Sequence, residues 1–76
     1  MQAIITKYHG PTDTKGARIS ATTEAGRVYV PLDHSLDTEA RHRVAAQALA
    51  DRMGWSGQLI AGALPNSSGY AFVFAD

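Results

Sequence analysis

The segment HGPTDTKGARI, residues 9–19, combines two glycines, two threonines and a lysine, the residue types of a phosphate-binding loop. A P-loop places four residues between its glycines and a lysine directly after the second glycine, where a helix begins. Here five residues separate Gly10 from Gly16, Lys15 precedes the second glycine, and a strand pattern follows. The spacing therefore excludes a P-loop. It predicts a hairpin loop in which the two glycines adopt unusual φ values.

The three histidines, His9, His34 and His42, are the residues with the chemistry to bind a metal ion. They form no i, i+3 or i+4 pair and the chain has no cysteine, so we expect no metal ion and no cofactor. His42 lies on the apolar side of a helix predicted over 38–53, which favours a partly buried, hydrogen-bonded structural role. The sequence contains no nucleophile elbow, HExxH motif or paired glutamates. We therefore predict no catalytic residue and no enzyme activity.

Basic and aromatic residues occupy the outward positions of the first three predicted strands, and polar residues fill the loop between the first two. The candidate binding residues are Lys7, Tyr8, Thr12, Asp13, Lys15, Arg18, Arg27 and Tyr29. Lys7 or Tyr8 joins the outward face, depending on the register of the first strand. Such a face is typical of a protein interface, where Arg and Tyr are frequent hot spots. It equally suits single-stranded nucleic acid, or a solvent-exposed surface without a partner.

The elements that position these residues follow from hydrophobic periodicity and turn signals. Alternation of apolar and polar residues indicates strands, and the outward side of each early strand is expected to be solvent-exposed. The predicted strands cover 2–8, 17–22, 27–31, 57–64 and 69–74. With the helix after the third strand, the order is β-β-β-α-β-β. It predicts an α+β fold, a single antiparallel sheet of about five strands with one amphipathic helix on one face.

The predicted helix is an alanine-rich run with Asp37 as its N-cap and Gly54 as its C′ residue. At 100° per residue, its apolar arc comprises His42, Ala45, Ala46, Leu49 and Met53. The opposite side carries Arg43, Gln47 and Asp51. We expect the apolar arc to pack on the sheet. The side chains expected to meet it from the last strand are Tyr70, Phe72 and Phe74.

Length and composition limit what this fold can do. The 76 residues suffice for a single domain, 1–76, with one small core. Seven Lys and Arg residues balance seven Asp and Glu residues, so binding to nucleic acid would require the basic residues to gather on one face. The absence of cysteine excludes disulfides. No apolar run approaches the roughly 20 residues that span a bilayer, so we expect no membrane partner and a cytoplasmic location.

Three segments carry a resemblance: TKYHGPTDTKGARISA at 6–21, HRVAAQALADRMGW at 42–55 and GYAFVF at 69–74. Together they resemble a family of small, mostly uncharacterised proteins from proteobacterial phages, plasmids and other mobile elements. No catalytic residue is attached to that family. The resemblance implies a sheet with one helix and a setting in which small proteins often inhibit host defence, anti-CRISPR proteins among them.

The small size, neutral charge and missing catalytic motifs favour a function carried by the surface. We expect a non-enzymatic interaction protein of a mobile element, monomeric or homodimeric, that binds a host protein or protein complex. The binding surface would be the exposed sheet face or the 9–16 loop. The alternative is a nucleic-acid-binding accessory protein that uses the basic and aromatic sheet face. Steep weakening of binding with salt would distinguish this alternative.

Overall fold

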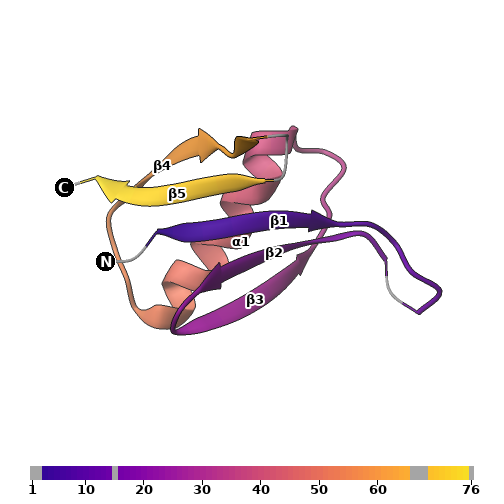
Figure 1. Cartoon of the computed structure of the whole chain (residues 1–76), viewed down its shortest axis with the longest axis horizontal. Coiled ribbons are helices and arrows are strands. Elements are labelled where there is room, and N and C mark those ends of the chain that lie inside the picture. Colours follow the sequence, from indigo (N-terminus) through magenta and orange to yellow (C-terminus); the bar gives the residue numbers. More distant parts are fainter. Residues whose placement is uncertain (1–2, 15, 66–68, 76) are drawn as a thin grey trace.

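The computed structural model describes residues 3–14, 16–65 and 69–75. The elements in this part of the chain are β1 (Ile4–His9), β2 (Arg18–Thr23), β3 (Gly26–Pro31), α1 (Thr38–Met53), β4 (Gln58–Ala63) and β5 (Tyr70–Ala75). The strands form one antiparallel sheet in the order β3-β2-β1-β5-β4, and α1 crosses one face of it (Figure 1). The predicted α+β fold and its element order are confirmed. The helix has the predicted bounds, and the strand ends shift by one or two residues.

β1 lies in the middle of the sheet, because it pairs with β2 on one side and with β5 on the other. Thr6 is opposite Ala21 of β2 and Tyr70 of β5, and opposed residues in antiparallel strands share a face. Thr6 and Ala21 are fully buried, so this face lies against α1. With a period of two, Lys7 points to the other face and Tyr8 to the helix side. This register answers the question that the sequence left open for β1.

The hydrophobic core lies between α1 and the sheet. Its largest fully buried side chains are Phe72, Ile4, Ile19, Leu49 and Thr6. Tyr70 and Phe74 pack against this core and are partly buried, as predicted for the apolar face of the last strand. Because most other buried positions are alanines, a few large side chains fill most of the core volume.

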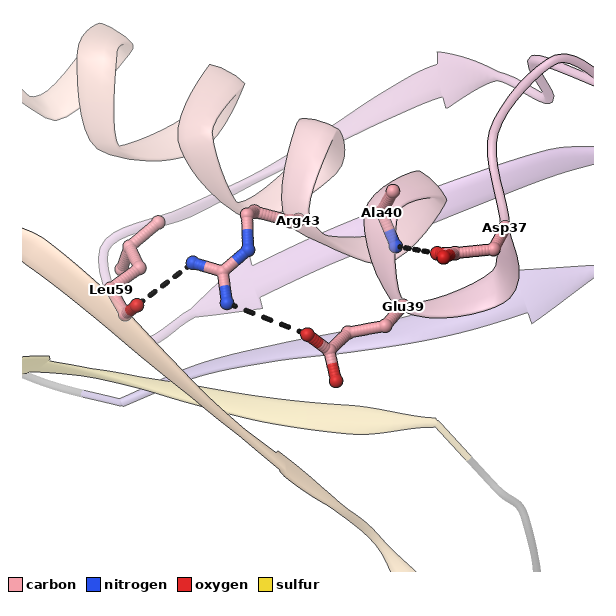
Figure 2. Close-up of polar contacts among 5 residues, drawn as sticks. All are labelled: Asp37, Glu39, Ala40, Arg43 and Leu59. Atoms are coloured by element: carbon pink, nitrogen blue, oxygen red, sulfur yellow. Dashed lines mark hydrogen bonds and ion pairs between the residues drawn. The ribbon is translucent and has the colours of Figure 1, made fainter.

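The ends of α1 follow from its capping residues. The carboxylate of Asp37 accepts a hydrogen bond from the backbone N–H of Ala40 at 2.8 Å (Figure 2), and Gly54 adopts φ 72° at the C-terminal end. The buried side of the helix comprises His42, Ala45, Ala46, Leu49 and Ala50. Ala50 thus replaces Met53 in the fully buried arc, and Met53 packs at its margin. Both caps and most of the predicted arc are confirmed.

Arg43 differs from the position expected for it on the solvent side of α1. Its Nη1 donates a hydrogen bond to the carbonyl oxygen of Leu59 in β4 at 2.8 Å, and Nη2 lies 3.7 Å from Glu39 Oε2 (Figure 2). Its guanidinium carbon lies 5.4 Å from the ring centroid of Phe72. A long side chain can thus reach back to the sheet from a position that the helical angle alone assigns to solvent. The carbonyl oxygen of Leu59 in the edge strand β4 therefore accepts a hydrogen bond from within the fold.

A loop of residues 10–17 joins β1 to β2 and projects beyond the end of the sheet (Figure 1). The predicted hairpin is confirmed, but the reason given for its glycines is wrong. Among the described residues, positive φ values occur at Gly54, Gly57 and Gly69 and not at Gly10 or Gly16. A loop of this length can reverse the chain over several residues, so it does not need the left-handed conformation of a two-residue turn.

Candidate functional site

The sheet face turned away from α1, here called the open face, is the candidate site. Lys7, Arg18 and Arg27 point to this face, whereas none of its described strand residues is acidic. The formal charge of the open face is therefore positive, although the chain as a whole has a formal net charge of zero. The fold thus gathers basic residues on one face, which composition alone could not decide.

Five residues of β1, β2 and β3 form what we call the basic cluster: Lys7, His9, Arg18, Arg27 and Tyr29. The guanidinium carbon of Arg18 lies 5.4 Å from the centroid of the Tyr29 ring. The His9 ring meets the same tyrosine edge-on, with centroids 5.7 Å apart and an angle of 60° between the planes. Arg27 Nη1 donates to the Tyr29 hydroxyl at 3.3 Å. Tyr29 therefore links the basic side chains of three strands.

Ser20 corrects the expectation that the outward side of β2 is solvent-exposed. Its side chain points to the open face, yet only 4% of the residue is accessible. Its hydroxyl oxygen lies 2.9 Å from Nε2 of His9. Ser20 lies in the middle strand of the β1-β2-β3 half of the sheet, so longer side chains from both neighbouring strands flank it. The Ser20 hydroxyl at the base of the basic cluster is therefore largely removed from solvent.

The electrostatic environment of His9 reflects this arrangement. Partial burial lowers the pKa of His9, and the positive charges of Arg18, Lys7 and Arg27 lower it further. All three charged neighbours favour loss of the imidazole proton. The same three charges favour the approach of an anion.

Arg18 carries an unpaired polar atom in this cluster. Its Nη1 is buried and has no hydrogen-bond partner in the described part of the chain. Buried side-chain donors in folded proteins are usually hydrogen-bonded, so an unpaired one calls for an explanation. Arg18 and Tyr29 also line a shallow depression of about 370 Å³ where β2 begins and β3 ends.

An aliphatic region adjoins the basic cluster on the open face, formed by Ile5 of β1, Ile60 of β4 and Val73 of β5. Ile60 and Val73 are directly opposed, and Ile5 is opposite Ala71 of β5. The three large side chains and Tyr29 are each between 40% and 50% exposed. The open face therefore combines positive charge and apolar surface, the two features of an interface with a protein.

The structure brings together four of the eight candidate residues that the sequence suggested: Lys7, Arg18, Arg27 and Tyr29. Tyr8 lies on the helix side, and Thr12 and Asp13 lie in the projecting loop. Lys15 lies outside the described residues. Sequence reasoning missed His9, Ser20 and the aliphatic region. His9 could have been found by extending the alternation of the first strand two residues beyond Lys7.

On the helix side, His42 has the structural role predicted for it. The residue is 4% exposed, and its Nδ1 lies 2.7 Å from Thr6 Oγ1. Thr6 Oγ1 also lies 3.3 Å from the carbonyl oxygen of Tyr70, which can only accept a hydrogen bond. His42 therefore connects α1 to Thr6 of β1, and its ring packs against Tyr70 of β5. It also lines a pocket of about 420 Å³ with residues that include Tyr8, Thr38 and Tyr70.

We expect the free energy of unfolding to fall as the pH is lowered below about 6.5. Burial lowers the pKa of His42 in the folded state, so the unfolded chain takes up a proton that the folded chain resists. The stabilisation is thus complete above the pKa of unfolded histidine and is lost as the pH falls through it. Urea unfolding between pH 7.5 and 5 measures the slope.

His9 contributes to this slope in the same direction, because its pKa is also lowered. The variants His42→Gln and His9→Gln separate the two contributions. We expect both variants to reduce the slope, and His42→Gln to reduce it more, because His42 is the more deeply buried of the two histidines. A wild-type stability that does not change between pH 7.5 and 5 would contradict the prediction.

No three side chains of His, Asp or Glu in residues 3–14, 16–65 and 69–75 lie close enough together to hold a metal ion. No helix in the same ranges is both long and apolar enough to cross a bilayer. Comparison of the chain with protein-family models, curated proteins and solved structures found no match.

Proposed function

We propose that this chain is a non-enzymatic interaction protein that binds an acidic surface of another protein through its open face. The observation that carries the proposal is the uneven distribution of charge in a chain with a formal net charge of zero. The described strand positions of the open face hold three cationic side chains and no carboxylate. An acidic partner would complement this charge, and complementary potentials favour both encounter and register. The exposed Tyr29 and the half-buried Arg18 supply the residue types that most often dominate binding energy.

The aliphatic region favours a protein partner over a nucleic acid. Burial against apolar side chains of a partner would make binding more favourable by about 25 cal/mol per Å² of apolar surface. The surface of Ile5, Ile60 and Val73 would contribute in this way, whereas contact with phosphates would not bury it against apolar groups. Sheets that bind single strands usually stack two or three bases on aromatic rings. Among the described residues of the open face, Tyr29 alone offers a phenol ring for stacking. That ring already contacts His9 and Arg18. The basic cluster by itself supports the alternative of nucleic-acid binding.

The resemblance to proteins of phages and other mobile elements supports a more specific form of this proposal. In that form the partner is a component of a host defence complex in the bacterial cytoplasm, and binding inhibits it in the manner of an anti-CRISPR protein. The small size of the chain and its open face suit an inhibitor that acts by covering a partner's surface.

The double variant Arg18→Glu and Tyr29→Ala tests the open face. Truncation of such residues at an interface costs about 2 kcal/mol each or more, and the reversed charge adds repulsion from an acidic partner. We therefore expect affinity to fall by about a thousandfold or more. The control is Arg52→Glu, an exposed charge reversal at the end of α1, on the other side of the sheet. Circular dichroism and urea unfolding verify that both variants fold.

Binding is measured by affinity capture from nuclease-treated bacterial lysate, and inhibition by phage plaquing on a host with an active CRISPR system. We expect the wild type and Arg52→Glu to retain the same protein and to protect the phage, and the double variant to lose both properties. Retention of the partner by a folded double variant would rule out the open face as the binding surface. Capture that disappears after nuclease treatment would support the nucleic-acid alternative instead.

A further inference from the structure

The most specific chemical feature of the open face is the unpaired guanidinium nitrogen of Arg18. Nη1 is removed from solvent without gaining a hydrogen bond in the described part of the chain. The guanidinium is at the same time held over the ring of Tyr29, with 5.4 Å between its carbon and the ring centroid. Because Nη1 has almost no accessible surface, an anion reaches it only when the guanidinium shifts toward the depression that Arg18 and Tyr29 line, and this shift gives the unpaired donor an acceptor.

The strand residues that surround Arg18 on the open face carry positive charge and no negative charge. Lys7 and Arg27 lie on the strands to either side. The described strand positions of the open face hold no carboxylate, and Glu24 of the β2-β3 turn lies with Arg27 along another depression, which Arg18 does not line. The depression that Arg18 and Tyr29 line, about 370 Å³, gives a small ligand group access to this end of the sheet. An anion that enters the depression beside Arg18 would therefore meet positive charge on all three strands of this half of the sheet.

We propose that Arg18 is a recognition site for an oxyanion, bound by the paired N–H groups of its guanidinium beside Tyr29. The oxyanion in the complex is the carboxylate of an Asp or Glu side chain of the partner, an assignment that rests on the proposed function. Arg forms two parallel hydrogen bonds with a carboxylate, whereas the point charge of Lys does not reproduce this geometry. The site thus binds by geometry as well as by charge.

The chain alone tests the chemistry of the site. Arginine Nε–H and backbone amide signals of the ¹⁵N-labelled protein are recorded at pH 7 while sodium acetate, sodium phosphate or sodium chloride is added at constant ionic strength. We expect acetate and phosphate to produce a saturable shift at Arg18 and Tyr29, and chloride to produce none. Acetate represents a side-chain carboxylate, and phosphate represents a nucleic-acid backbone or phosphorylated group.

Two matched variants separate geometry from charge. Arg18→Lys keeps the charge and loses the paired donors, so we expect acetate to bind at least about tenfold more weakly. Arg52→Lys makes the same exchange at an exposed guanidinium in the last turn of α1, on the other side of the sheet, and we expect acetate affinity to be unchanged. Dispersed amide spectra verify folding of both.

Several results would overturn the proposal. No saturable shift at Arg18 in the wild type, or equal acetate affinity in Arg18→Lys, would remove the oxyanion site. Saturation by phosphate without any response to acetate would remove the carboxylate as its ligand. These results are distinct from failure of the proposed function, which is judged by protein capture. Acetate binding without capture leaves the site and removes the protein partner, and capture without acetate binding does the reverse.

Discussion

The Leu49→Ala variant is expected to lose about 2–5 kcal/mol of unfolding free energy. Leu49 is fully buried and is the large aliphatic side chain on a helix side that otherwise presents alanines and His42 to the sheet. Small neighbours cannot expand to fill the cavity, so the loss includes both the transfer of the leucine side chain and the cavity left behind. Native proteins have unfolding free energies of about 5–15 kcal/mol, so the variant would lose a large fraction of its stability.

Urea unfolding followed by circular dichroism measures this loss, with Val44→Ala as the matched control. Val44 lies on the same helix and is 47% exposed, so we expect a change within about 0.5 kcal/mol. Equal stability of Leu49→Ala and the wild type would contradict the assignment of the core face of α1.

The second large effect is expected at Gly69, where Gly69→Ala should destabilise the fold by at least about 2 kcal/mol. Gly69 precedes β5 with φ 148°, a conformation that side-chain-bearing residues rarely adopt. A β-carbon there would also collide with the carbonyl oxygen of Thr6 in β1. The carbonyl belongs to the central strand, so no change of rotamer relieves the collision. The two strands would have to separate where Thr6 is opposite Tyr70.

Gly62→Ala provides the matched control for this substitution. Gly62 lies in β4 without a positive φ, and the nearest atom to a β-carbon there is the Ala71 carbonyl oxygen at an ordinary 4.0 Å. We expect its stability to change by less than about 1 kcal/mol, with a gain favoured because alanine restricts the unfolded chain. Melting temperatures of the two variants measured side by side test the difference. Equal losses at both positions would show that the close approach of Gly69 to β1 is not the cause.

The local signals of the sequence were sufficient for the element order. Asp37 and Gly54 mark the ends of α1 because capping depends on a few adjacent residues. Alternation in 27–31 assigned Val28 to the core and Tyr29 to the opposite side, because successive residues of a strand point to opposite faces. These properties are decided by neighbours along the chain.

Only the tertiary structure decided which residues of β1 share the open face and which side chains on that face are buried. Pairing of β1 with both β2 and β5 places Lys7 beside the arginines and Tyr8 on the helix side, and it buries Ser20 beneath its neighbours. The same pairing brings the start of β5 against Thr6, where only glycine fits at position 69. Each of these relations joins residues far apart in sequence, and strand register depends on the summed pairing and packing of the whole sheet. Periodicity within one strand therefore determines what alternates, and only the assembled sheet determines what each side chain meets.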